Sequence, residues 1–192
     1  MTSEPDKQTQ QALEKAMFLF WSKGVANASY PDIVAATGLS RKALYARWPD
    51  KTALVHASLN FYRETVLAQI LAQLTPPGMK ALDHFWRYLE AGMTSGSYNG
   101  CLLFRTAGQD GGADPEISAA LSDHLHLLKQ AFTAAFTQAI QDGDLCADFD
   151  IDQAIWQVLA ILTTLSSFGG NPSLVNDMPA LIAVGRSSSG LK

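Results

Sequence analysis

The chain has 192 residues, of which 47% are hydrophobic and 17% charged, a balance that excludes a disordered or fibrous protein. Its net charge of −4 is divided unevenly: residues 1–52 carry seven basic and five acidic side chains, and the remainder carries seven basic and thirteen acidic ones. A basic N-terminal part on an acidic remainder is typical of a protein that meets a polyanion at one end only.

Targeting and redox signals point to a cytoplasmic protein without membrane association. The N-terminal residues lack the charged and then apolar pattern of a signal peptide, and polar residues interrupt the longest apolar stretch, 151–168. Cys101 and Cys146 are too few for a disulfide framework, so we expect reduced thiols.

The first part of the chain predicts three helices in close succession. Apolar residues recur at helical spacing over 13–24. Ser29 is a candidate N-cap of a second helix, which Gly38 is expected to end because glycine accepts the left-handed backbone of a helix stop. A third helix follows over 40–47. We expect these helices to form a head domain, residues 1–50.

Six further helices are predicted in the rest of the chain. A long helix over 51–74 has apolar residues on two faces, which suits a connector between the head and a body domain, residues 51–192. The other helices are expected over 82–93, 101–109, 115–142, 150–168 and 173–186. A tail at 187–190 is expected to fray. No convincing strand pattern occurs, so the predicted fold is all-α with nine helices.

The second and third predicted helices have the spacing of a helix-turn-helix, with a turn at 37–39. Arg41, Lys42, Arg47 and Lys51 place four cations within eleven residues around the third helix. In a helix-turn-helix, the N-terminal residues of the second helix reach base edges in the major groove, and cations attract the phosphates. This pattern favours DNA binding over ordinary solvated charges on a surface helix.

Residues 13–54 resemble the N-terminal domain of TetR-family transcriptional regulators. The matching segments are ALEKAMFLFWSKGV, residues 12–25, and ASYPDIVAATGLSRKALYARWPDKTAL, residues 28–54. The resemblance implies a homodimer that binds a pseudo-palindromic operator, usually as a repressor, with Tyr45 and Lys51 on phosphates.

The candidate DNA-binding residues follow from the cation pattern and the resemblance together. Lys42, Ala43 and Arg47 depart from the residues that are frequent in the family, so the operator sequence does not transfer. The candidates are Ser29, Ser40, Arg41, Lys42, Ala43, Tyr45, Arg47 and Lys51.

The middle of the chain is rich in aromatic residues, and small-molecule pockets are mostly apolar with a few polar groups. For each aromatic residue, plain packing in the core is the alternative. The candidate residues of a pocket for a small-molecule effector are Tyr62, Phe85, Trp86, Leu89, Cys101, Phe104, Arg105, His124, Leu128 and Trp156.

Cys101 carries a separate hypothesis. It opens a predicted helix in a Gly-Cys-Leu segment, which resembles one group of TetR-family proteins that includes sensors of electrophiles or oxidants. A thiol at a helix N-terminus has a lowered pKa and reacts as the thiolate. The alternative is a small buried side chain that only packs.

The last two long helices are candidates for a dimer interface, because the helix over 150–168 is apolar nearly all round. A monomer core is the alternative. The candidate interface residues are Ile155, Val158, Leu159, Leu162, Leu174, Met178, Leu181 and Ile182.

Other classes of function find less support. The sequence lacks a phosphate loop and the common metal or catalytic motifs, so we expect neither an enzyme nor a metal or cofactor site. His124 and His126 face different sides of a predicted helix and make a poor metal site. A nonspecific nucleoid or protein-interaction module is the remaining alternative.

Overall fold

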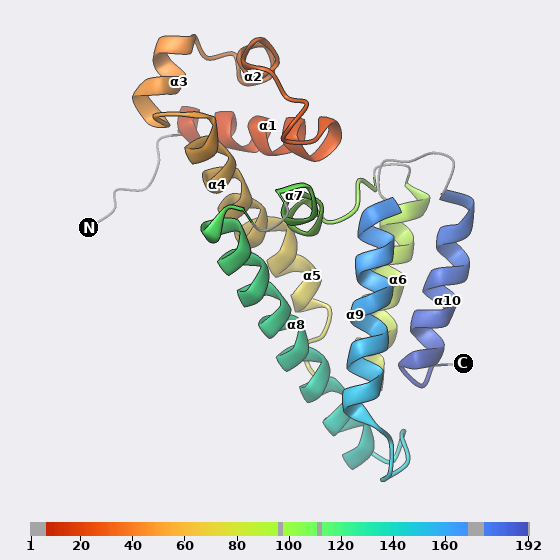
Figure 1. Ribbon diagram of the computed structural model, residues 1–192. Helices are drawn as coiled ribbons and strands as arrows, with labels where there is room; N and C mark the ends of the chain where they lie inside the picture. Colours follow the sequence, from red (N-terminus) through yellow and green to blue (C-terminus); the bar gives the residue numbers. More distant parts are fainter. Residues whose placement is uncertain (1–6, 96–97, 111–112, 169–174, 192) are drawn as a thin grey trace.

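The computed structural model describes residues 7–95, 98–110, 113–168 and 175–191, and these parts are helical with no strand. Nine helices result when the continuous segment 51–72 is counted once, as predicted. A head of three helices stands on a longer helical body (Figure 1). The elements are α1 Lys7–Lys23, α2 Tyr30–Thr37, α3 Arg41–Arg47, α4 Lys51–Tyr62, a π-helical turn Arg63–Leu67, α5 Ala68–Ala72, α6 Met79–Thr94, α7 Leu102–Asp110, α8 Pro115–Gln141, α9 Ile151–Phe168, a 3₁₀ turn Val175–Asp177 and α10 Met178–Ser188.

Local capping signals set the ends of the head helices. Ser29 caps α2 in a capping box with Asp32, each side chain bonding the other's backbone N–H. Gly38 ends α2 with a left-handed φ of 73°, which a side chain would disfavour. Ser40 caps α3 by accepting the backbone N–H of Ala43. These caps and the glycine stop therefore define where the two short helices begin and end.

The head core continues without a break into the body. Phe20, Ile33 and Leu44 of the head belong to one buried cluster with Leu59 of α4 and Leu103 of α7. In Figure 1, α4 descends from the head and α7 lies beside it. The connector helix α4 therefore packs directly against the core beneath the helix-turn-helix. The boundary at residue 50 stays a prediction.

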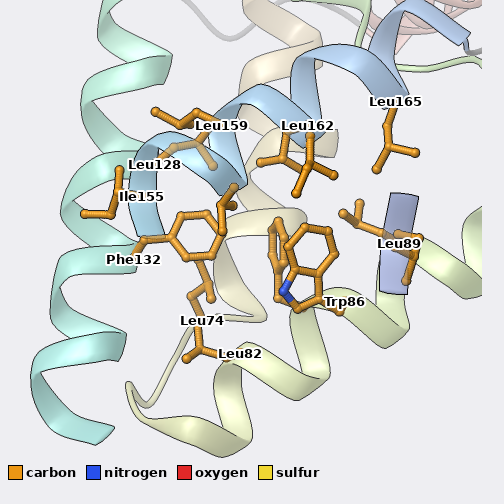
Figure 2. Close-up of a cluster of buried hydrophobic side chains, with 14 of the residues drawn as sticks. Leu74, Leu82, Trp86, Leu89, Leu128, Phe132, Ile155, Leu159, Leu162 and Leu165 are labelled. Atoms are coloured by element: carbon orange, nitrogen blue, oxygen red, sulfur yellow. The ribbon is translucent and has the colours of Figure 1, made fainter. Parts of the chain in front are cut away.

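The body core gathers around Trp86. Figure 2 shows side chains from α6, α8 and α9 converging on it, with Phe132 and Leu162 among them. The rings of Phe85 and Phe132 meet edge to face, their centroids 5.0 Å apart. Phe85, Trp86 and Phe132 are fully buried. Burial of these rings together with the surrounding aliphatic side chains stabilises the body.

The C-terminal segment is docked, so the prediction of a frayed tail is wrong. The indole Nε1 of Trp86 donates to the hydroxyl of Ser189 at 2.9 Å, and Ser189 is 0% exposed. Gly185 brings the backbone of α10 against the same indole, where a Cβ would overlap the ring. Arg186 pairs with Asp83 of α6 at 2.6 Å. Trp86 thus holds the last helix in place, which composition alone did not indicate.

No helix within the described ranges combines the length and apolar character that a bilayer span requires.

Candidate DNA-binding surface and ligand cavity

The helix α3 presents an exposed cluster of Arg41, Lys42 and Tyr45. Tyr45 is 46% exposed, which is high for a large aromatic side chain. The guanidinium of Arg41 lies 5.2 Å from the ring centroid of Tyr30, and the rings of Tyr30 and Tyr45 are 5.5 Å apart. The Tyr30 ring thus supports the Arg41 guanidinium near the N-terminus of α3, and the Tyr45 ring lies beside it. Cations and a tyrosine on one exposed surface fit phosphate and base contacts.

Arg47 and Lys51, which were predicted to contact DNA, make hydrogen bonds to other parts of the head. The Arg47 Nε donates to the Thr9 hydroxyl at 2.8 Å and its Nη1 donates to the Ala43 carbonyl at 3.1 Å, so Arg47 ties α3 to α1. The Lys51 ammonium donates to the Val25 carbonyl at 2.7 Å. Both side chains therefore brace the head. Ser29 and Ser40 act as helix caps.

A cavity of about 350 Å³ lies under the head, between the connector helix and the body. That volume is within the range of small-molecule sites. Its lining residues come from α1, the connector, α6, α7, α8, α9 and the segment before α7. They are Trp21, Tyr62, Val66, Leu67, Ile70, Phe85, Tyr88, Leu89, Ala91, Gly92, Tyr98, Gly100, Cys101, Phe104, His124, Leu162 and Ser166.

Six of the ten predicted pocket residues line this cavity. They are Tyr62, Phe85, Leu89, Cys101, Phe104 and His124. The connector residues Val66, Leu67 and Ile70 also line it, and the second apolar face of that helix was the signal that could have found them. Trp21 of the head had no such signal.

Four predicted pocket residues lie elsewhere. Trp86 and Leu128 are fully or nearly fully buried in the body core. The Arg105 guanidinium donates to the backbone carbonyls of Trp21 and Asn99 at 2.9 and 2.7 Å, so it fastens α7 to neighbouring segments. Trp156 is 63% exposed on α9, with the Lys129 ammonium 4.1 Å from its ring centroid.

The cavity is uncharged. Burial, with a smaller effect of Arg63, lowers the pKa of His124 to about 4, so its imidazole is neutral at neutral pH. Burial raises the pKa of Tyr62 and of Tyr98 well above the usual value of tyrosine. Among the described residues that line the cavity there is no Asp, Glu, Lys or Arg.

The predicted activation of the Cys101 thiol is wrong in direction. Burial raises the pKa of Cys101, and this outweighs the lowering by the backbone amides of Leu103 and Phe104 and by a hydrogen bond with Tyr62. The thiol is therefore protonated near neutral pH and belongs to the apolar wall. No group of three or more His, Cys, Asp or Glu side chains in the described ranges is placed to hold a metal ion.

The connector has an irregular turn beside the cavity and a polar contact with α8. A π-helical turn, Arg63–Leu67, interrupts it beside the cavity, and the Thr65 hydroxyl donates to the Phe61 carbonyl at 2.6 Å there. Higher up, the His56 ring lies 2.7 Å from Asp114 and 2.8 Å from Glu116, at the start of α8. Single π turns are frequent at functional sites.

The predicted dimer residues mostly face the protomer's own core. Leu181 is half-buried against the same cluster, and Leu174 lies outside the described residues. The six that are buried between α9, α10 and the rest of the body are Ile155, Val158, Leu159, Leu162, Met178 and Ile182. Within one protomer these apolar faces are buried, and their role in a dimer interface stays a prediction. The exposed side of α9 and α10 carries Trp156, Ala160 and Val184 instead.

Comparisons with known proteins agree with this architecture. The sequence matches the family model of bacterial regulatory proteins of the tetR family over residues 12–58. It also matches the tetracyclin repressor-like C-terminal domain over residues 78–168. The HTH-type transcriptional repressor ComR of Escherichia coli (strain K12) is 43% identical over 63 residues, which are 33% of this chain and 30% of ComR.

Solved structures share the fold across nearly the whole chain. A cysteine mutant of the TetR-family regulator CifR, in complex with operator DNA, superimposes with a TM-score of 0.72 at 24% identity and covers 98% of both chains. A TetR-family regulator of Cytophaga hutchinsonii reaches a TM-score of 0.80 at 15% identity, covering 97% of this chain and 96% of that one. With both domain models matched, the chain belongs to the TetR family of bacterial DNA-binding transcriptional regulators.

Proposed function

We propose that this protein represses transcription by binding a palindromic operator as a homodimer, and that a small molecule in the cavity releases it. The observation that carries the proposal is the exposed cluster of Arg41, Lys42 and Tyr45 on the second helix of a helix-turn-helix. ComR is named a repressor, and the CifR structure contains operator DNA. Both similarities support operator binding by the present protein.

DNA binding would use the exposed surface of α3. Lys42 and Arg41 supply positive charge for phosphates or guanine edges. Tyr45 offers a hydroxyl at the same surface. Arg47 and Lys51 contribute by holding α3 and α4 in position through the Thr9 and Val25 contacts.

Ligand response would run through the connector. Tyr62, Val66 and Leu67 line the cavity, and the same continuous helix begins at Lys51 directly beneath α3. A ligand shifts the balance between two positions of the connector only by its different affinity for them. A coupling of about 1–3 kcal/mol would weaken operator binding about 5–150-fold.

The homodimer would use the outer face of α9 and α10. Two adjacent helices there expose Trp156, Ala160 and Val184, of which Trp156 and Val184 are large apolar side chains. A two-fold contact is self-complementary, and an operator with two half-sites needs two heads.

Replacing Ala160 and Val184 together with glutamate is expected to convert the dimer into a folded monomer. Four like charges would then be brought together across the two-fold axis, where repulsion and the loss of solvent oppose association. Light scattering after size-exclusion chromatography measures the mass, and circular dichroism checks the fold. Leu127→Glu, an exposed apolar residue on α8, is the matched control and should remain dimeric. A variant that stays dimeric would place the interface elsewhere.

Footprinting on the DNA upstream of the chain's own gene tests the proposed activity. We expect a protected site with two half-sites about one helical turn apart. At about 150 mM salt, the protected duplex should bind about 1,000-fold or more tightly than a scrambled duplex of the same length. Equal retention of both duplexes would instead support a nonspecific nucleoid protein.

A further inference from the structure

We propose that the cavity binds an uncharged, mainly aromatic molecule of about two fused rings, whose single hydroxyl or carbonyl group hydrogen bonds to His124. The inference takes from the proposed function only that this cavity is the effector site. It goes further in naming the chemical class of the ligand and the residue that selects it.

His124 is a polar group of the cavity wall that can bond a ligand. Its side chain lines the cavity and is 4% exposed. Its ring meets Phe104 edge to face at 5.9 Å, and no hydrogen-bond partner for it occurs among the residues that the structure describes. A ligand that covers the imidazole without a hydrogen bond would leave it unsatisfied, at a cost of about 1–3 kcal/mol, so a ligand that supplies the bond binds more tightly.

Three other polar groups of the wall are already engaged, whereas the hydroxyls of Tyr88 and Tyr98 are further polar groups that line it. The Trp21 indole donates to the Gly100 carbonyl at 2.9 Å, and the Ser166 hydroxyl donates to the Leu162 carbonyl at 2.6 Å. The Tyr62 hydroxyl is hydrogen bonded with the Cys101 thiol. A neutral imidazole has one donor and one acceptor, so His124 suits either a hydroxyl or a carbonyl.

The uncharged wall disfavours charged ligands. An anion would meet a neutral His124; Arg63 is paired with Asp123 at 3.5 Å, and Arg105 is bonded to the carbonyls of Trp21 and Asn99. A cation would meet no carboxylate, because the described lining residues include none. A charge buried without a partner costs several kcal/mol, so ions bind more weakly than neutral molecules of the same shape.

Size and surface point to two rings. A cavity of about 150 Å³ holds benzene, and this one measures about 350 Å³. Phe85, Tyr88 and Phe104 supply aromatic faces and edges around it. Flat aromatic molecules gain both apolar burial and favourable ring contacts against such walls.

Four probes of one shape test the class: naphthalene, β-naphthol, β-naphthoate and β-naphthylmethylammonium, titrated by calorimetry or fluorescence into the full chain without DNA at neutral pH. We expect β-naphthol to bind tightest, about five- to tenfold better than naphthalene, the worth of one hydrogen bond. Both ions should bind at least about tenfold more weakly than β-naphthol. An ion that binds as tightly, or β-naphthol that fails to bind the folded protein, overturns the proposal.

Variants of His124 test the residue. His124→Leu should bind naphthalene and β-naphthol equally, within about twofold, because only the hydrogen bond is lost. His124→Gln restores a donor and an acceptor and should regain the preference for β-naphthol. The matched control, His126→Leu, changes an exposed histidine of the same helix that lies outside the cavity and should behave as the unmodified protein. A preference for β-naphthol that survives in folded His124→Leu overturns the role of His124.

Operator retention, measured separately with and without β-naphthol, separates this inference from the proposed function. Binding with the expected preference and no release of DNA supports the ligand class and contradicts ligand response through the connector. Specific operator binding without any affinity for the neutral probes contradicts the ligand class and leaves the DNA-binding function standing.

Discussion

Replacing Arg41, Lys42 and Tyr45 together with alanine is expected to weaken operator binding about 100-fold or more, since each base or phosphate contact is worth about 1–3 kcal/mol. The three side chains are exposed and their contacts within the protein are with Tyr30 at the surface, so the fold should survive. Gel retention or fluorescence anisotropy with the footprinted duplex measures the loss, and circular dichroism reports the folded state.

Two further variants sharpen that result. Lys80→Ala removes an exposed cation near the start of α6, far from the head in Figure 1, and should leave operator affinity unchanged. Lys42→Ala alone should lower the slope of log affinity against log salt by about one per protomer if Lys42 meets a phosphate. Undiminished operator binding by the folded triple variant would contradict the assignment of α3 as the DNA-binding helix.

Trp86→Ala is expected to lower the free energy of unfolding by about 3–5 kcal/mol, the usual cost of removing a large buried aromatic side chain. The indole is fully buried, packs against Phe85 and the backbone at Gly185, and donates to Ser189, so its loss leaves a void and releases the C-terminal segment. Urea unfolding followed by circular dichroism measures the change.

Arg87→Ala, at the next position of α6, is the control for Trp86. Its side chain is largely exposed and pairs with Asp83 four residues earlier, an interaction worth at most about 0.5 kcal/mol on a helix surface. A Trp86→Ala protein with the same unfolding midpoint as Arg87→Ala would show that the body is held together without the indole.

Local chemistry in the sequence determined the helices and the head. The serine caps Ser29 and Ser40 and the glycine stop at Gly38 act within a few residues of themselves, so their effect does not depend on distant packing. The start of α8 at Asp114-Pro115 was predicted for the same reason. The family resemblance rested on residues 12–54, the segment that contains Ser29, Gly38 and Ser40.

Which neighbour covers each apolar face was decided only by the tertiary structure. Trp86 and Trp156 were both predicted to line the pocket, yet one fills the core and the other is exposed on α9. Val158 was predicted to face a partner, and within the protomer it is fully buried in the body core. Helical periodicity states which residues share a face, but the burial of that face depends on contacts between segments far apart in the chain.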